Sequence, residues 1–119
     1  MEIKLFDSEL KVMDILWKEG DTTAKQIAKI LKEQVGWSKT TTYTVIKKCI
    51  KKGAIGRYEP DFVCHPIITR EKARVLETTE LINKMYDGAT DQLVAFILGQ
   101  KNLSPEEIKR LKEIVSKLD

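Results

Sequence analysis

The stretch WSKTTTYTVIKKCIKKG, residues 37–53, has the pattern of an amphipathic helix. Ser38 is a favourable N-cap residue and Gly53 a favourable stop, so we expect a helix from about Ser38 to Lys52. Apolar or small residues recur at i, i+3, i+4, i+7 and i+8, which is the spacing of a helix face that packs against a core. We expect that face to contain Thr42, Val45, Ile46, Cys49 and Ile50.

The opposite face of this predicted helix is basic and rich in hydroxyl groups, and it carries no carboxylate. A purely structural surface helix usually mixes in glutamate, which pairs with lysine one turn away. From Gln34 to Tyr58 there is no acidic residue, and six basic residues give this segment a charge of +6, whereas the whole chain carries +3 and its remaining residues therefore −3. A concentrated basic segment is typical of a surface that binds a polyanion, although a solvated lysine-rich face would give the same run. The face contains Lys39, Thr40, Tyr43, Thr44, Lys47, Lys48 and Lys51.

Two more helices are expected upstream. The first runs over about 8–19, with Asp7 or Ser8 as its cap and Gly20 as its stop. The second begins at Thr23, which stands at capping-box spacing from Gln26, and ends at Gly36. The expected inner faces are Leu10, Met13, Leu16 and Trp17 on the first helix, and Ile27, Ala28 and Leu31 on the second.

Two short strand-like runs follow, at 54–58 and 62–65, separated by the turn residues Glu59-Pro60-Asp61 and closed by Pro66. Three helices followed by a small hairpin are the layout of a winged helix. We therefore predict a mainly α fold with a small β-hairpin wing, in which a winged helix-turn-helix DNA-binding domain occupies residues 1–67.

The last third, residues 68–119, has a helical pattern again. Helices are expected from Thr69 to about Tyr86, over 91–98, and after Ser104, where Pro105 and Glu107 complete a strong start signal. These helices carry more apolar residues than a small appendage needs, which favours a two-fold dimer interface over one larger monomeric core. The predicted helical dimerisation domain contributes Leu76, Ile82, Met85, Leu93, Phe96, Ile97, Leu111, Val115 and Leu118 to that interface.

Several function classes are disfavoured. No apolar run approaches the ~20 residues that span a bilayer, and the first residues lack the features of a signal peptide. Two cysteines form no disulfide framework and suit a reducing compartment, so we expect a cytoplasmic protein without membrane insertion. The single histidine, His65, follows Cys64 in a predicted strand, where adjacent side chains point to opposite faces. We therefore expect no catalytic site, no metal site and no cofactor.

The sequence resembles the penicillinase-repressor family, the BlaI, MecI and CopY type of winged-helix regulators. The resemblance extends over about residues 5–118, and its most specific block is Trp37-Ser38, Thr41, Thr44 and Lys51-Lys52-Gly53. Weaker matches are Glu9 with Val12-Met13 and Leu16-Trp17, Gly20 with Thr23–Ile27, Phe62-Val63 with Pro66, and the LSPEEI segment at 103–108.

The resemblance implies a homodimeric transcriptional repressor, associated with β-lactam resistance, that binds a palindromic operator in double-stranded DNA. It places base-edge contacts on Lys39, Thr40, Thr41, Tyr43 and Thr44. From the residues themselves, we expect phosphate contacts from the lysines further along the helix and from the helix starts. The predicted phosphate-binding set is Thr23, Ser38, Lys47, Lys48, Lys51 and Arg57. The alternative is a winged helix that serves protein–protein interaction without direct DNA binding.

Three departures from the family pattern concern cleavage, copper sensing and the contact of the wing with DNA. The resemblance implies cleavage in a pathway that includes a membrane sensor-transducer metalloprotease, but the family's Asn-Phe site is Ala95-Phe96 here. The copper branch's C-terminal cysteine motif has no counterpart after Cys64. The wing is shorter, and Glu59 and Asp61 at its tip would repel phosphate.

Overall fold

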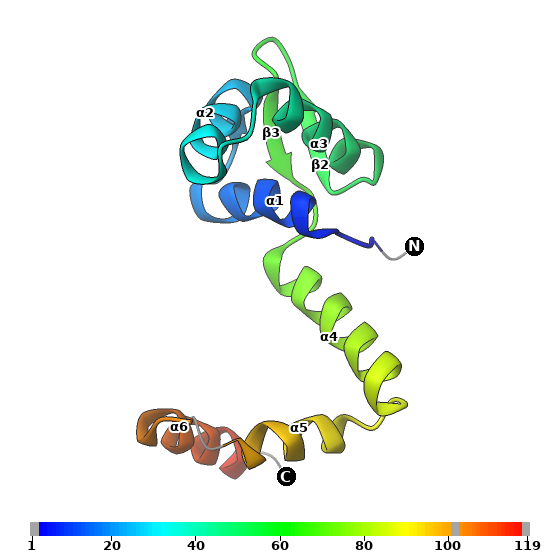
Figure 1. Cartoon of the computed structure of the whole chain (residues 1–119), viewed down its shortest axis with the longest axis vertical. Coiled ribbons are helices and arrows are strands. Elements are labelled where there is room, and N and C mark those ends of the chain that lie inside the picture. The colour runs from blue at the N-terminus through cyan, green and yellow to red at the C-terminus, as the bar shows by residue number, and fades with distance from the viewer. Residues whose placement is uncertain (1–2, 101–102, 118–119) are drawn as a thin grey trace. The chain divides into compact units, whose positions relative to one another are not determined.

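The computed structural model describes residues 3–100 and 103–117, and within them it contains six helices and one small sheet (Figure 1). The chain divides into two compact units, one ending at Thr78 and one beginning at Thr79. The division falls inside a helix and not after residue 67, where the sequence pattern placed the domain boundary. The helices are α1 (Asp7–Glu19), α2 (Ala24–Val35), α3 (Lys39–Lys51), α4 (Arg70–Tyr86), α5 (Thr90–Gly99) and α6 (Pro105–Ser116).

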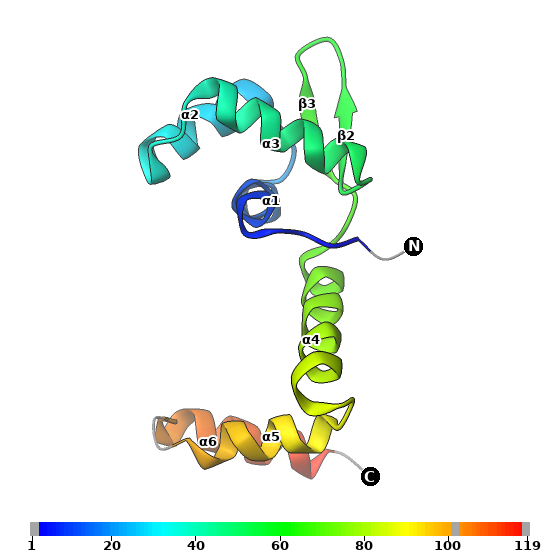
Figure 2. The same cartoon turned by 45° about the vertical axis from the view of Figure 1, so that its right-hand side comes forward.

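The sheet is antiparallel, with the strand order β1-β3-β2. The predicted hairpin is present as β2 (Ile55–Tyr58) and β3 (Val63–Pro66), and it lies beside α3 in both views (Figures 1 and 2). The third strand, β1 (Thr22–Thr23), was not predicted. It pairs Thr22 with Cys64 and Thr23 with Val63, so it attaches the start of α2 to the wing.

The helix caps of the first unit largely follow the sequence pattern. The side chain of Thr23 accepts a hydrogen bond from the Gln26 N–H, and that of Ser38 accepts one from the Thr41 N–H, both at 3.1 Å. Gly36 ends α2 in the left-handed region at φ 75°, a conformation that costs glycine little. The prediction for α1 was wrong by one residue: its N-cap position is Phe6, whose N–H donates to Glu9 Oε1 at 2.8 Å.

The core of the first unit is formed by α1, α2, α3 and the sheet. The predicted inner face of α3 is confirmed, since Thr42, Val45, Ile46 and Cys49 are buried, while Ile50 is half-buried. The inner face of α2 is also confirmed. The inner face of α1 is rotated from the prediction: Met13 and Leu16 are buried together with Val12 and Ile15, but Leu10 and Trp17 are only half-buried.

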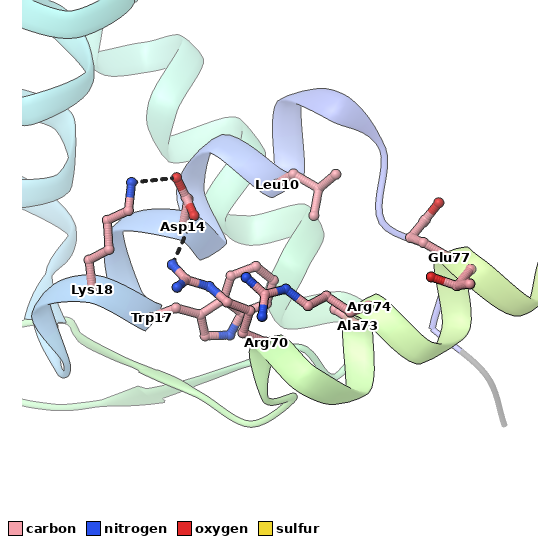
Figure 3. A pocket seen from close by; sticks show the side chains of 9 residues that line it. Leu10, Asp14, Trp17, Lys18, Arg70, Ala73, Arg74 and Glu77 are labelled. Carbon is pink, nitrogen blue, oxygen red and sulfur yellow. Dashed lines mark hydrogen bonds and ion pairs between the residues drawn. The ribbon is translucent and has the colours of Figure 1, made fainter. Parts of the chain in front are cut away.

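The first half of α4 packs on α1, which explains why the unit extends to Thr78. Ala73 is buried in the core, and the Trp17 indole N–H donates to the carbonyl of Ile68 at 3.0 Å. Asp14 accepts from Lys18 at 3.0 Å and from Arg70 at 3.1 Å (Figure 3).

The second unit contains the end of α4 with α5 and α6. The capping box of α6 is confirmed: the Glu107 N–H donates to Ser104 Oγ and the Ser104 N–H to Glu107 Oε1, each at 3.1 Å. No described residue of α5 or α6 is buried. Most of the residues predicted for a dimer interface are accessible: the exposed ones are Met85, Phe96, Ile97 and Val115, and the half-buried ones are Ile82, Leu93 and Leu111. Leu76 is also half-buried, but it packs on the core of the first unit. Leu118 lies outside the described residues.

Candidate nucleic-acid interface

The outer face of α3 lies on the surface of the first unit. Among the residues predicted to contact bases, Lys39, Thr40, Thr41 and Thr44 are exposed and Tyr43 is half-buried. The three lysines predicted to contact phosphate from α3, Lys47, Lys48 and Lys51, are exposed as well. The first half of the helix thus presents hydroxyl groups together with the ammonium group of Lys39, and the second half presents ammonium groups.

Hydrogen bonds fix several of the hydroxyl groups. Ser38 Oγ donates to Thr41 Oγ1 at 3.0 Å while it caps the helix, so the Thr41 side chain is held at the helix entry and faces solvent. Thr44 Oγ1 donates to the carbonyl of Thr40 at 2.9 Å. Because that hydrogen is already used, Thr44 offers an incoming base only its oxygen lone pairs and its methyl group.

Tyr43 contacts aromatic and cationic groups that join α3 to the wing. Its ring meets the ring of Phe62 edge to face, with centroids 5.7 Å apart, and Lys39 Nζ lies 5.5 Å from the Tyr43 centroid. The guanidinium carbon of Arg57 in turn lies 3.6 Å from the centroid of Phe62. The wing therefore limits the orientations that Tyr43 can adopt. No local pattern predicts the contact between Tyr43 and Phe62, because it joins residues 19 positions apart.

Arg57 differs from the other predicted phosphate ligands because it already has an anionic partner. Its Nε donates to Glu59 Oε1 at 2.6 Å, and both side chains are roughly half exposed. The pair neutralises Glu59, one of the two wing carboxylates expected to repel phosphate, but not Asp61. It also leaves Arg57 less free than Lys47 or Lys51 to meet a phosphate.

A basic pocket of about 800 Å³ lies between α2 and the start of α3. It brings together Thr23 and Ser38, the two N-cap residues predicted to contact phosphate, with Lys39. Three lining lysines were missed by the sequence analysis although their spacing of i, i+4 and i+7 places them on one face of α2: Lys25, Lys29 and Lys32. No carboxylate lines this pocket, so it extends the basic surface of α3 onto α2. Trp37, at its edge, is half-buried and packs against the core, as expected for a side chain that supports the helix entry.

The residues considered for catalysis are placed unfavourably for it. Cys49 and Cys64 are buried, and burial raises the pKa of Cys49 to about 12 and that of Cys64 to about 11, so both stay protonated at neutral pH. His65 Nδ1 lies 2.6 Å from Asp21 Oδ1. In residues 3–100 and 103–117 no group of three or more His, Cys, Asp or Glu side chains is arranged to hold a metal ion. In the same residues, no helix has the length and apolarity that crossing a membrane requires.

The helix order, the exposed basic third helix and the hairpin that packs beside it define a winged helix-turn-helix protein. The chain matches the family model described as penicillinase repressor over residues 5–117, and it belongs to that family. The family is one of transcriptional repressors, which confirms that the chain is not an enzyme.

Curated relatives match along almost the whole chain. The penicillinase repressor of Bacillus licheniformis is 30% identical over 114 residues, which cover 94% of this chain and 89% of that protein. The methicillin resistance regulatory protein MecI of Staphylococcus aureus (strain N315) is 28% identical over 116 residues, which cover 96% of this chain and 94% of that protein.

Solved structures match the winged-helix part. The DNA-binding domain of the repressor BlaI is 31% identical with a TM-score of 0.54, and the match covers 58% of this chain and 87% of that one. The monomeric form of Bacillus licheniformis BlaI in complex with the blaP half-operator has the same identity and coverage, with a TM-score of 0.53.

Proposed function

We propose that this protein is a homodimeric transcriptional repressor that binds a palindromic operator and places α3 in the major groove. The observation that carries the proposal is the basic surface formed by α3 and by the pocket between α2 and α3: neither α3 nor the lining of the pocket contains a carboxylate. An α-helix fits the major groove, and the exposed hydroxyl and ammonium groups of α3 match the donors and acceptors displayed there. The similar BlaI structure in complex with a half-operator supports the same mode of binding for this chain.

The two halves of α3 have different roles in this proposal. Lys39, Thr40, Thr41, Tyr43 and Thr44 contact base edges, because their side chains are exposed, or in Tyr43 half-exposed, near the N-terminus of the helix. The phosphates are contacted by Lys47, Lys48 and Lys51, by the N-caps Thr23 and Ser38, and by Arg57 once it leaves Glu59. The pocket lysines of α2 belong with this second group.

The apolar surface of the second unit supports the dimer. Met85 is 66% exposed, Val115 63% and Phe96 56%, and all three were predicted for the interface. In a single chain these apolar side chains remain exposed to water, and the favourable free energy of burying them is lost. We therefore propose that a second copy of the chain covers them. A two-fold dimer would present two α3 helices about one DNA turn, roughly 34 Å, apart.

The salt dependence of binding tests this function. A duplex selected from a randomised pool by the full-length protein should be a palindrome. Its affinity should fall by about 10³–10⁵ between 50 and 200 mM salt if ~6–10 phosphates are neutralised. Failure to select any duplex, or an affinity that does not respond to salt, would instead support the interaction module without DNA binding.

Release of the operator by proteolysis stays a prediction from the family. Ala95 and Phe96 both lie on α5 and are exposed. If a membrane sensor-transducer metalloprotease pathway acts on this chain, induced cells should contain a fragment that ends at Ala95. Mass spectrometry of the repressor before and after induction measures this, and an intact chain in derepressed cells would contradict it.

A further inference from the structure

A pocket of about 510 Å³ lies between α1 and the first half of α4, within the unit that ends at Thr78 (Figure 3). Its lining residues all come from these two helices, so it is separate from the proposed DNA surface on α2 and α3. The volume is in the range of pockets that hold small molecules. Nothing in the proposed binding of DNA uses it.

One wall of the pocket is apolar and preformed. It is made by Trp17, Leu10 and Ala73. The Trp17 indole N–H donates to the carbonyl of Ile68 at 3.0 Å, which fixes the orientation of the ring. The guanidinium carbon of Arg70 lies 5.7 Å from the centroid of the same ring, so a flat apolar group on the indole would lie beside this cation. The fixed orientation of the ring lowers the cost of binding.

The charges in the pocket favour an anion. The carboxylate of Asp14 is shared by Lys18 at 3.0 Å and Arg70 at 3.1 Å, and the hydrogen bond from Lys18, with the nearby Arg70, lowers the pKa of Asp14. Arg74, one helical turn after Arg70, is exposed and has no ion-pair partner within residues 3–100 and 103–117. The other lining carboxylate, Glu77, lies at the opposite end of the pocket from Lys18 (Figure 3).

We propose that this pocket binds a small carboxylate that carries a flat apolar ring. The ring lies on Trp17, and the carboxylate pairs with Arg74, whose planar guanidinium matches it with two parallel hydrogen bonds. Two arginines one turn apart make this end of the pocket cationic even after Asp14 has neutralised one of them. The proposal does not depend on DNA binding, because the site can be tested with the protein alone.

The two tryptophans of the chain allow a direct test by NMR. Their indole N–H resonances are recorded for the full chain and assigned with the Trp37→Phe variant. Benzoate is then titrated, in parallel with its neutral counterpart benzamide. We expect benzoate to shift the Trp17 resonance with a Kd on the order of 1–10 mM, as for a ligand of so few atoms, and to leave Trp37 in place. Benzamide should bind at least about fivefold more weakly, since it lacks the charge.

A pair of matched variants locates the carboxylate. Arg74→Gln should weaken benzoate about fivefold or more and leave benzamide unchanged. Lys11→Gln removes one positive charge from an exposed position on α1 that does not line the pocket, and it should change neither ligand. Equal binding of benzoate and benzamide, an unchanged benzoate affinity in Arg74→Gln, or equal shifts at both tryptophans would each overturn the proposal. So would the absence of any saturable shift up to about 50 mM benzoate, a concentration above the expected Kd.

Discussion

At the scale of single residues, we expect different side chains of α3 to determine the sequence preference and the general affinity for DNA. We expect Tyr43→Ala to change which bases are preferred, at a cost of about 1–3 kcal/mol for the preferred duplex and little for others. Lys47→Ala should weaken all duplexes about equally and lower the slope of log K against log salt by about 1. Affinities for the selected palindrome and a scrambled duplex, each at several salt concentrations, measure both effects. If both variants changed sequence preference alike, the division of roles along α3 would be wrong.

Phe62 is expected to act on sequence preference although it lies on the wing. Its ring centroid lies 5.7 Å from that of Tyr43, and the guanidinium carbon of Arg57 lies 3.6 Å from the Phe62 centroid. Phe62→Leu keeps an apolar side chain but removes the edge-to-face contact, so Tyr43 gains orientations and the palindrome loses part of its advantage over the scrambled duplex. Tyr58→Leu, at an exposed position of the same hairpin, is the matched control.

A double-mutant cycle separates this effect from a loss of wing structure. If Phe62 acts through Tyr43, Phe62→Leu should have little further effect on sequence preference in the Tyr43→Ala background. Additive effects of the two substitutions would show that Phe62 influences binding by another route.

At the scale of elements, a nearly buried ion pair ties the end of α3 to the start of α1. Glu9 is 1% exposed, and its Oε1 lies 2.6 Å from Lys52 Nζ, which also donates to the carbonyl of Lys4. Lys52 is the C-cap residue of α3. Glu9→Gln keeps an acceptor for the Phe6 N–H but leaves the ammonium without its anion, so we expect a loss of about 1–3 kcal/mol in the free energy of unfolding.

Urea denaturation at a fixed protein concentration measures this loss, because oligomerisation makes stability depend on concentration. Asp14→Asn is the control: it removes a carboxylate of the same helix that is about half exposed, where an ion pair contributes less than about 1 kcal/mol. Equal effects of the two substitutions would contradict the special role of the buried pair.

The elements also show how far local sequence determines this structure. The bounds, caps and inner face of α3 could be predicted because helix periodicity and capping depend on residues within one or two turns. The strand β1 could not, since its two residues adopt that conformation only by pairing with β3 some forty positions later. The same limit applies to the pair Glu9–Lys52 and to the contact between Tyr43 and Phe62. In the candidate site, the exposure of the lysines and threonines on the outer face of α3 was predictable from helix periodicity, whereas the lysines of α2 join that face only through the packing of the two helices.

At the scale of the whole molecule, the proposed repressor depends on two copies acting on one operator. Each winged-helix unit offers one α3, and a single copy would contact only half of a palindrome. Linking two such copies makes the second contact intramolecular, which commonly raises overall affinity by about 10²–10⁴. The exposed apolar side chains of α5 and α6 are the surface that we expect to provide the link.

A charged substitution on α6 tests the link. Val115 is exposed and apolar, so in the proposed interface Val115→Asp would bury an unpaired carboxylate, which is costly enough to separate the copies. Sedimentation velocity should then show a monomer, and the palindrome should lose most of its advantage over a duplex that contains one half-site, while the affinity for that half-site stays unchanged. Ser116→Asp places the same charge one residue further along the helix, at an exposed polar position, and should remain dimeric. If the Val115→Asp protein stayed dimeric, α6 would be excluded from the interface. If the wild-type protein were monomeric and still preferred the full palindrome, the operator would not be bound as proposed.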